Sequence, residues 1–430
     1  MKSFIKKIIF FILTLEARLV LRKYKPRIIA VTGNVGKTST KDAIYSILKN
    51  THYVRKSEKS FNSEIGVPLT ILGCDSGWNN PFVWISNIFE GLALILLKNH
   101  YPKILVLEIG ADRPGDIESV TRWLKPDIAV ITKIGDTPVH VEYFSSASEL
   151  VKEKAYLATA LGSDGMLILN ADDKNTLSIK QKSKARTMTF GLGKIGDIRA
   201  SNEKIIYNKK GKPKAINFKV NYGSNSLPVE LNGTVGFHYI YSVLAAMAVG
   251  ITEGVNLISA AQWIAGFSAT PGRLKIIEGI SDSTILDDTY NAAPAAVNAA
   301  IDALSEVKTE GRKIAVLGDM MELGKQSVEE HRKIGEKVAE TCDFLVTVGT
   351  RSADIWKAAN KKKMYKKDML HFASSEEAGE KLKKILKEGD IVLVKGSQSA
   401  RMERVVERIM AHPEDKQKLL VRQESEWLKR

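Results

Sequence analysis

From residue 27 onward, short runs of apolar residues alternate with longer stretches in which apolar and polar residues follow a helical spacing. The apolar runs are short and predict strands that are buried on both faces. The predicted strands are Arg27–Thr32, Ile104–Ile109, Asp127–Ile134 and Gly165–Asn170, and helical patterns lie at Lys37–Leu48 and Ser146–Leu161. This alternation is typical of a doubly wound α/β domain with a mostly parallel sheet.

The pattern changes over residues 186–232. The segments RTMTFG, EKIIYN, INFKVNYG and LPVELNG are short, alternate in polarity and are separated by Gly, Asn and Pro. They predict antiparallel strands added to the main sheet. Helical patterns follow around 238–250 and 256–266.

A domain boundary is predicted near Thr270–Arg273, where Pro and Gly interrupt any helix. A second α/β set begins there, so we predict a Rossmann-like domain over 271–412 after a central domain over 27–270, with a charged tail at 413–430. Its predicted strands are Thr284–Asp287, Lys313–Leu317, Phe344–Val348 and Asp390–Val394, and its predicted helices lie near 294–306, 327–341, 351–359, 375–387 and 401–411.

The N-terminal segment 1–26 is apolar with basic flanks. Its run IIFFIL at 8–13 is too short to span a bilayer, and no small-residue cleavage site follows it. We therefore predict an amphipathic basic helix over residues 3–24. Its apolar face either lies on an anionic membrane surface or packs on the protein itself, and the interrupted apolar stretch Phe82–Leu97 is a candidate partner for it.

The composition narrows the class of partner. The 430 residues carry a formal net charge of +15, which favours anionic partners. Many lysines lie in helical stretches such as 360–367 and 380–387, where a solvated helix face accounts for them, and we expect no nucleic acid partner. The two cysteines, Cys74 and Cys342, are too few for a disulfide framework or a zinc site. We expect a reducing, cytoplasmic location, which includes the inner face of the membrane.

A phosphate-binding loop is predicted where the strand at Arg27–Thr32 runs into the next helix. Glycines let the backbone approach phosphate oxygens, and a helix N-terminus, a lysine and a hydroxyl complete such a site for a nucleotide triphosphate with Mg²⁺. Val31 stands where the longer form of the motif has Gly, so the match is to the shorter form, G-x-x-G-K-T. The predicted nucleotide-binding residues are Gly33, Asn34, Val35, Gly36, Lys37, Thr38 and Ser39.

The loop sequence TGNVGKTST resembles that of the Mur ligases. Further matches to this family follow in the family's order over residues 27–411, and several resemble the branch that adds D-alanyl-D-alanine. They are FNSEIGVPLTIL (61–72), EIGADRPGDI (108–117), NADD (170–173), PGRLK (271–275), LDDTYNAAP (286–294), VLGDMMELG (316–324) with His331, and VLVKGSQSARME (392–403).

The resemblance implies an ATP-dependent amide ligase. Members phosphorylate a substrate carboxylate, and an amine then displaces phosphate from the acyl phosphate. The substrates implied are a muramyl peptide carboxylate and D-alanyl-D-alanine or another amine. Charge on the transferred phosphoryl group requires cations, and two Mg²⁺ ions are implied.

The family pattern also assigns catalytic and metal-binding roles. Lys37 corresponds to the lysine at the β- and γ-phosphates. Thr38 and Glu108 correspond to the ligands of the first Mg²⁺, and an acidic residue at a strand end suits a hard cation. His140 and a carbamylated Lys154 correspond to the ligands of the second Mg²⁺, with Lys133 in the preceding strand where the family usually has Asn.

The remaining roles fall on both predicted domains. Asn170 and Arg273 are implied at the nucleotide, and Asp288 at the ribose, although its neighbour Asp287 fits equally well. Because the ATP and amine sites lie on different domains, a closing motion is implied. The residues implied at the amine substrate are Asn291, Lys395, Gly396, Ser397 and Arg401.

Several departures keep other functions open. Only 32 residues precede Gly33, so we expect the uridine-diphosphate-binding domain of the family to be absent. Tyr239 and Ser242 replace an Asn that commonly meets the adenine, and Ala293 replaces another Asn. The alternatives are a related ligase with a different acceptor or amine, and a non-catalytic nucleotide-binding scaffold at the membrane surface. The sequence leaves the oligomeric state open.

Overall fold

The computed structural model describes residues 3–58, 64–78, 80–135, 144, 146–424 and 427. The chain forms two compact units. The first unit comprises residues 1–201, 219–229 and 239–267, and the second comprises residues 202–218, 230–238 and 268–430. The division into four segments that the sequence predicts stays a prediction.

A nine-stranded sheet has the order β2-β3-β1-β4-β5-β6-β7-β8-β9. Strands β1, β3, β4 and β5 are almost wholly buried, as their continuous apolar sequences predict, and neighbours in this part of the sheet are parallel. The predicted parallel α/β sheet is confirmed. Its strands are β1 (Arg27–Thr32), β2 (Val54–Lys56), β3 (Ile104–Glu108), β4 (Ile128–Ile131), β5 (Met166–Asn170), β6 (Arg186–Gly191), β7 (Ile198–Tyr207), β8 (Pro213–Tyr222) and β9 (Asn225–Asn232).

Strand β6 corrects one expectation. The segment RTMTFG was predicted to be antiparallel, but β6 pairs parallel to β5, with Met166 opposite Arg186. The physical reason is the connection, because a helical crossover, α7 (Lys174–Ser178) with η1 (Ile179–Lys182), returns the chain to the same end of the sheet. Strand β7, which contains most of the segment EKIIYN, also pairs parallel to its neighbour β6, with Phe190 opposite Ile198, so the antiparallel expectation is wrong at this pair too. Strands β7, β8 and β9 follow one another through short turns.

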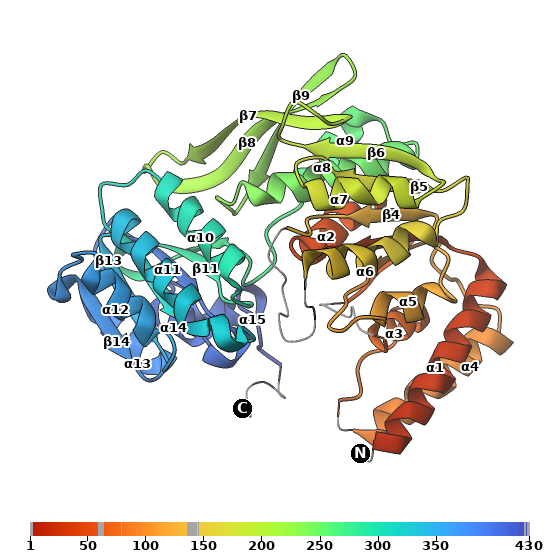
Figure 1. Cartoon of the computed structure of the whole chain (residues 1–430), viewed down its shortest axis with the longest axis horizontal. Coiled ribbons are helices and arrows are strands. Elements are labelled where there is room, and N and C mark those ends of the chain that lie inside the picture. The colour runs from red at the N-terminus through yellow and green to blue at the C-terminus, as the bar shows by residue number, and fades with distance from the viewer. Residues whose placement is uncertain are drawn as a thin grey trace. The chain divides into compact units, whose positions relative to one another are not determined.

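Helices lie along both sides of the strands in the first unit (Figure 1). Local signals set their ends. Helix α6 (Ala147–Thr159), for example, begins where the Ser146 hydroxyl accepts a hydrogen bond from the Glu149 N–H. The other helices are α1 (Ser3–Tyr24), α2 (Lys37–Leu48), α3 (Gly66–Leu72), α4 (Pro81–Leu96), α5 (Asp116–Thr121), α8 (His238–Thr252) and α9 (Leu257–Ile264).

The second unit has a six-stranded sheet of order β10-β11-β15-β12-β13-β14. All pairs are parallel except β10 with β11, as expected for a Rossmann-like unit with one added edge strand. Its strands are β10 (Lys275–Glu278), β11 (Thr284–Asp288), β12 (Lys313–Gly318), β13 (Phe344–Val348), β14 (Met369–Phe372) and β15 (Ile391–Lys395). Its helices are α10 (Pro294–Glu306), α11 (Ser327–Thr341), α12 (Ala353–Lys361), α13 (Ser375–Ile385), α14 (Glu403–Ile409) and α15 (Lys416–Leu419), with short 3₁₀ turns η2 (Ile280–Asp282), η3 (Gly324–Gln326), η4 (Lys366–Asp368), η5 (Gln398–Ala400) and η6 (Pro413–Asp415).

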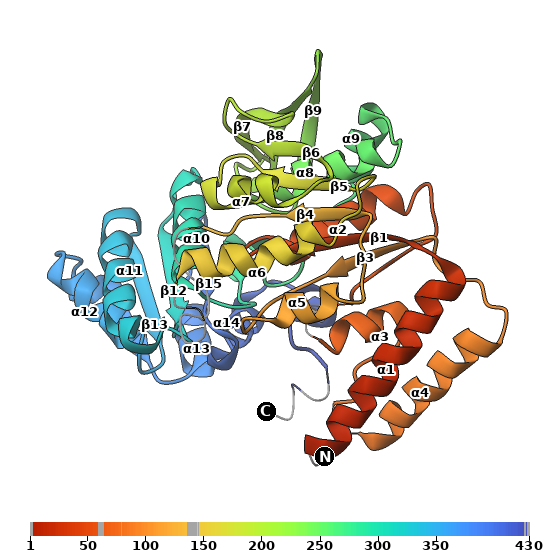
Figure 2. The ribbon, with the colours of Figure 1, turned by 45° about the vertical axis from the view of Figure 1, so that its right-hand side comes forward.

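Helices α1 and α4 lie side by side in the first unit (Figures 1 and 2). Leu13, Ala17 and Val20 of α1 are fully buried, and the Lys23 ammonium donates to the Leu94 carbonyl oxygen at 2.8 Å. The apolar stretch that begins at Phe82 is therefore the packing partner of α1. In the part of the chain that the structure describes, no helix is both long and apolar enough to span a membrane.

A carboxyl group lies in the contact between α1 and α4. Glu16 faces Gly91, where a Cβ atom would lie 2.3 Å from Glu16 Oε2. The same Oε2 is buried without a hydrogen-bond partner among the described residues. Burial raises the pKa of Glu16 from 4.5 to about 7.

We predict that the stability of this helix pair falls as the pH rises from about 4.5 to about 7. A raised carboxyl pKa means that the folded state holds the proton while the unfolded state loses it, so the stabilisation is complete below the unfolded pKa and lost above the folded one. Thermal unfolding between pH 4.5 and pH 8 measures this. Glu16→Gln should flatten the dependence, and an unchanged pH profile in this variant would contradict the assignment.

Candidate active site

The phosphate loop joins β1 to α2 and is fastened to the end of β4. The N–H groups of Asn34 and Val35 donate to the Lys133 carbonyl oxygen at 2.7 and 3.3 Å. The Asn34 side chain donates to the Ile134 carbonyl oxygen at 2.6 Å. The loop is thus shaped by its neighbour strand before any ligand binds.

Glycine is required at two positions of this loop. Gly33 has a φ of 141°, and a Cβ atom there would lie 2.0 Å from Thr132 Oγ1. Gly36 has a φ of 85° and precedes the first residue of α2. These left-handed conformations and the close backbone approach are unfavourable for other residues.

Lys37 and Thr38 occupy the first turn of α2. Lys37 Nζ lies 3.0 Å from the Gly33 carbonyl oxygen, so its ammonium folds over the loop. The Thr38 hydroxyl donates to Glu108 Oε2 at 3.0 Å. The Thr38 hydroxyl lies at the N-terminus of α2, and the Glu108 carboxylate lies at the end of β3. Both are the hard oxygen donors that Mg²⁺ prefers, so these two residues fit the predicted metal site.

Lys41 is a site residue that the sequence did not single out. Its side chain is 1% exposed, and its Nζ atom lies 3.7 Å from Glu108 Oε2 and 2.8 Å from the Ser57 carbonyl oxygen. The Glu108 N–H in turn donates to Ser57 Oγ at 3.0 Å. Lys41 therefore balances the charge of the buried Glu108 carboxylate. The available signal was its place one turn after Lys37 in α2.

Lys154 is buried on α6, with 1% of its surface exposed. Burial, reinforced by the charge of Lys37, lowers the pKa of Lys154 to about 7. Its neighbour Glu153 accepts hydrogen bonds from the Gly115 and Ile117 N–H groups at 2.8 and 2.6 Å. These bonds fix α6 to the beginning of α5, and the nearby Asp112 and Asp116 also act on the charge of Lys154.

His140 lies outside the described residues, as does part of the segment FNSEIGVPLTIL. Within the described ranges, no three His, Cys, Asp or Glu side chains gather as a metal-ion site. The predicted ligands that the structure does describe are Thr38, Glu108 and Lys154. The structure places all of them in the first unit.

Asn170 ends β5 and is 3% exposed. Its side-chain oxygen accepts a hydrogen bond from the Asp172 N–H at 2.9 Å, which shapes the following turn. The next acid, Asp173, accepts from the Ile134 and Gly135 N–H groups at 2.6 and 2.9 Å. Asp173, also missed from the sequence, connects this turn to the end of β4.

In the second unit, three predicted residues come together. Asp288 Oδ2 lies 2.6 Å from Lys395 Nζ, and Lys395 also donates to the Asn291 carbonyl oxygen at 2.8 Å. Lys395 is 2% exposed, and its burial lowers its pKa. Strands β11 and β15 are adjacent, with Asp288 opposite Lys395 in the register, which explains their contact.

Asp287, the alternative to Asp288, is fully buried, and its hydrogen-bond partners belong to the second unit. Its carboxylate accepts from the Gly272 N–H at 2.9 Å and from the Thr289 hydroxyl at 2.6 Å. Burial raises the pKa of Asp287 to about 6. These contacts give Asp287 a structural part, which favours Asp288 for a ligand.

Arg273 follows the predicted boundary and lies with its guanidinium 4.0 Å from the centre of the Tyr290 ring. Gly272 makes this approach possible, because it has a φ of 68° and a Cβ atom there would lie 2.9 Å from the Tyr290 nitrogen. The Tyr290 N–H donates to the Gly272 carbonyl oxygen at 3.0 Å. The cation is thereby stacked and oriented.

A cavity of about 360 Å³ lies at the carboxyl ends of β12, β13 and β14. Ligands of parallel α/β sheets bind at this edge. Arg401 is the predicted residue that lines it, and Asp319, Glu376 and Arg404 are additional charged residues. Two guanidiniums and two carboxylates suit a small zwitterion with one carboxylate and one ammonium.

The loop that carries Gly396 and Ser397 packs against residues beside this cavity. A Cβ atom at Gly396 would lie 2.5 Å from Met402 Cγ. The Ser397 N–H donates to the Asp319 carbonyl oxygen at 2.9 Å, and the Ser397 hydroxyl lies 3.2 Å from that of Ser399. These contacts place Gly396 as a packing residue and leave Ser397 beside the cavity-lining Ser399.

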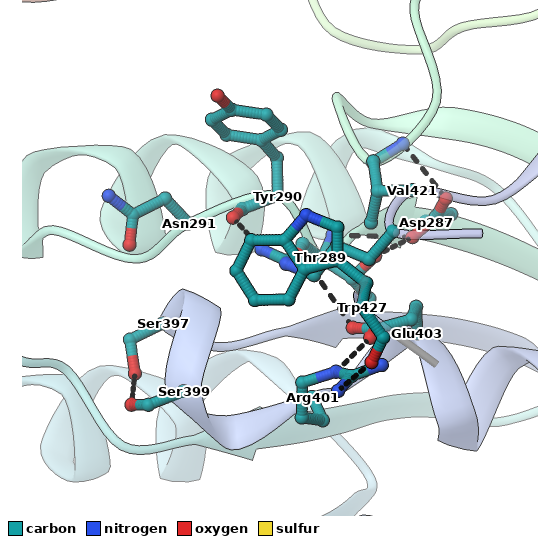
Figure 3. A network of polar contacts seen from close by, with 12 residues as sticks. Asp287, Thr289, Tyr290, Asn291, Ser397, Ser399, Arg401, Glu403, Val421 and Trp427 are labelled. Atoms are coloured by element: carbon teal, nitrogen blue, oxygen red, sulfur yellow. Dashed lines mark hydrogen bonds and ion pairs between the residues drawn. The ribbon is translucent and has the colours of Figure 1, made fainter. Parts of the chain in front are cut away.

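Arg401 is held by residues from the C-terminal segment (Figure 3). Its Nε atom lies 2.5 Å from Glu403 Oε1, and its Nη1 atom donates to the Trp427 carbonyl oxygen at 3.0 Å. Glu403 Oε2 accepts from Arg422 Nη1 at 2.9 Å, and this same atom donates to the Thr289 carbonyl oxygen at 3.1 Å. The segment predicted as a charged tail is thus fastened beside Arg401.

His331 has a structural part. It is fully buried in α11, and its Nε2 atom accepts a hydrogen bond from the Met320 N–H at 3.1 Å. Its Nδ1 atom lies 2.7 Å from the Ser327 carbonyl oxygen, so Nδ1 carries the proton. His331 therefore holds the loop after β12 that contains Asp319.

Comparison with known families matches two models. The Mur ligase middle domain matches residues 90–250, and the Mur ligase, glutamate ligase domain matches residues 272–398. Together they include β3 to β9 of the first sheet and most of the second unit. The phosphate loop lies ahead of the first match.

Individual relatives resemble nearly the whole chain. The chain is 28% identical over 399 residues to UDP-N-acetylmuramoyl-tripeptide–D-alanyl-D-alanine ligase of Bacillus subtilis, with 92% of this chain and 79% of that protein covered. It is 31% identical over 393 residues to the ligase of the same name from Buchnera aphidicola, with 89% and 75% covered. The crystal structure of MurF ligase from Thermotoga maritima in complex with ADP has a TM-score of 0.75 at 27% identity, covering 93% of this chain and 83% of that chain.

We predict that Arg422→Met lowers the free energy of unfolding of the second unit by about 3 kcal/mol. The pair of Arg422 and Glu403 is buried, with side chains 6% and 2% exposed, so the substitution leaves a buried carboxylate short of one partner. Urea denaturation measures the change. The exposed pair of Arg408 and Glu380 gives the control Arg408→Met, with an expected loss below about 1 kcal/mol. Equal losses in the two variants would contradict the prediction.

Proposed function

Because the chain belongs to the Mur ligase family, we propose that it is an ATP-dependent, ADP-forming ligase that joins D-alanyl-D-alanine to a carboxyl group of a UDP-N-acetylmuramoyl tripeptide. The observation that carries the proposal is the pair of Thr38 and Glu108, 3.0 Å apart beside the phosphate loop. This pair supplies hard oxygen ligands where the terminal phosphates of ATP bind.

The first step transfers a phosphoryl group. A carboxylate oxygen of the muramyl peptide attacks the γ-phosphorus, the bond to the β-phosphate oxygen breaks, and ADP leaves. Lys37 and the loop N–H groups would hold the phosphates, and Lys41 balances the charge of Glu108. Thr38 and Glu108 would hold a magnesium ion, which would supply the charge neutralisation that the phosphoryl transfer needs.

The second step forms the amide. The uncharged amine of D-alanyl-D-alanine attacks the acyl carbon, and inorganic phosphate leaves. In the cavity of the second unit, Arg401 and Arg404 would bind the dipeptide carboxylate, and Asp319 and Glu376 its ammonium. These carboxylates are also the acceptors at hand for the proton that the ammonium gives up before attack.

We further propose that a carbamate on Lys154 helps to hold a second Mg²⁺, together with His140. Carbamate formation consumes an uncharged amine and CO₂ and releases a proton. The pKa of Lys154, lowered to about 7 by burial, supports this step because much of the amine is uncharged near neutral pH. Its buried position also protects the product from water.

The other predicted roles belong to the same proposal. Asn170 and Arg273 would contact the nucleotide, and Asp288 its ribose, with Lys395 and Asn291 as companions of Asp288. The ion pair of Asp288 and Lys395, at 2.6 Å, supports a fixed orientation of that carboxylate. We also propose a cytoplasmic enzyme that touches a membrane through residues 3–24.

The test is phosphate release from ATP and Mg²⁺ with the muramyl tripeptide and D-alanyl-D-alanine, and with each omitted in turn. We expect release that needs both substrates and falls by at least about 100-fold in Lys37→Ala. An intact, ATP-binding protein that releases no phosphate with this pair would refute the proposed substrates. Phosphate release with another amine would identify the protein as a related ligase. No phosphate release with any amine would identify it as a nucleotide-binding scaffold.

The carbamate has its own prediction. Protein equilibrated with ¹³C-labelled CO₂ should show a carbamate signal by NMR that grows as the pH rises through 7, because only the uncharged Lys154 amine reacts. Lys154→Arg should lack the signal and most of the phosphate release, whereas Lys152→Arg, at an exposed neighbouring position, should keep both. A signal that persists in Lys154→Arg would overturn the assignment.

A further inference from the structure

Helices α1 and α4 each expose a stripe of large apolar side chains. Phe82 is 78% exposed, and Phe11 and Leu96 are each 70% exposed. Single exposed apolar residues are common, but two such stripes on neighbouring helices are not. The stripes consist of Ile8, Phe11, Leu15 and Leu19 on α1, and of Phe82, Ile85, Phe89, Leu92 and Leu96 on α4.

The spacing of both stripes is helical. Within each helix, successive members are three or four residues apart, so they lie along one face. The buried residues of α1, such as Leu13 and Val20, and those of α4, such as Trp84 and Gly91, lie on the opposite faces. Each helix therefore uses one face for the protein core and leaves a second apolar face uncovered. We call the two stripes together the α1–α4 face.

The charges next to this face are almost all positive. Helix α1 carries Lys7 near its beginning and Arg18 and Arg22 near its end, all exposed. Lys23 is exposed as well, but its ammonium donates to the carbonyl oxygens at the end of α4. Its one acid, Glu16, is buried. The charged residue of α4 is Glu90, and Lys98 follows the helix.

This combination fits a lipid surface. An amphipathic helix with aromatic and aliphatic side chains on one face and basic residues beside it lies in the headgroup region of anionic membranes. A protein partner would gain from polar groups that fix its orientation, and the two stripes carry none. The lengths of α1 and α4, 22 and 16 residues, and the charges along α1 suit contact with one leaflet.

We propose that the α1–α4 face docks on an anionic lipid bilayer, with its phenylalanines and leucines among the acyl chains and its basic residues at the phosphates. Helix α4 is as much a part of this face as the N-terminal helix. Docking of this kind is a property of the first unit alone and needs neither ATP nor any substrate.

The docking helix also reaches the catalytic region. Phe10 of α1 lines a cavity of about 390 Å³ with Ile65, Arg113 and Asp116. Asp116 is one of the acids whose charge acts on Lys154. Because Phe10 lies in α1, this cavity adjoins the docking helix. If the proposed function holds, this position suits an acceptor carried on a lipid.

The test is co-sedimentation of the full-length protein with vesicles of phosphatidylglycerol and phosphatidylethanolamine, beside vesicles of phosphatidylcholine, without substrates. We expect binding to the anionic vesicles that weakens with added salt, and at least about tenfold weaker binding to phosphatidylcholine. Phe11→Glu combined with Phe89→Glu should weaken anionic binding at least about tenfold. Both side chains are exposed, so the fold should persist.

The matched control is Ile195→Glu combined with Ile258→Glu, which places the same two charges at residues that are 73% and 60% exposed outside α1 and α4. Its vesicle binding should equal that of the unchanged protein. Thermal unfolding and ATP binding check that each variant is folded. Because no substrate is present, loss of binding separates this proposal from the ligase proposal.

Four outcomes would overturn the docking proposal or its anionic specificity. A folded protein that binds no vesicles excludes it, and so does a double variant that binds as well as the control. Binding to phosphatidylcholine that equals binding to anionic vesicles removes the part of the basic residues. A self-associated protein that the double variant makes monomeric, with no vesicle binding, assigns the face to a second copy of the chain.

Discussion

The Glu108 carboxylate, buried at the end of β3, is the contact around which the first half of the site is arranged. It accepts a hydrogen bond from Thr38 and lies 3.7 Å from the Lys41 ammonium, and the backbone N–H of Glu108 donates to Ser57 Oγ after β2. A buried carboxylate is stable only with such partners. The adjacent positions of β1, β2 and β3 in the sheet supply them, so the order of the strands and the chemistry of the site depend on one another.

In the second unit, the buried group that needs charged partners is the Arg401 guanidinium. Arg401 borders the cavity, and its position depends on Glu403, whose carboxylate it shares with Arg422. Asp288 and Lys395, the last residues of β11 and β15, form a second buried pair. In both cases the charged groups that are predicted to face a ligand are fixed by other charged groups, which would reduce the reorganisation needed when a charged substrate binds.

Local patterns made much of this fold predictable. The buried strands of both sheets follow from continuous apolar runs, and the phosphate loop from its glycines and the helix after it. The contact of Thr38 with Glu108 could be anticipated, because carboxyl ends of parallel strands meet at one edge. The direction of β6 could not, because short alternating segments look alike in parallel and antiparallel sheets. The roles of Lys41 and Arg422 depend on contacts with Ser57 and Thr289, which no local pattern reveals, and the role of His140 stays a prediction.

The bond between Arg422 and the Thr289 carbonyl oxygen joins residues 133 positions apart. During synthesis, β11 and the Thr289 backbone leave the ribosome long before Arg422 is made. Domains fold as they emerge from the ribosome, so the second unit can form its other contacts before Arg422 is made. Until then, Glu403 lacks its contact with Arg422, and Arg401 lacks its contact with the Trp427 carbonyl oxygen. By then the residues of the first unit, which end at 267, have all been made, so the contacts of Arg422 are among the last that the second unit can form.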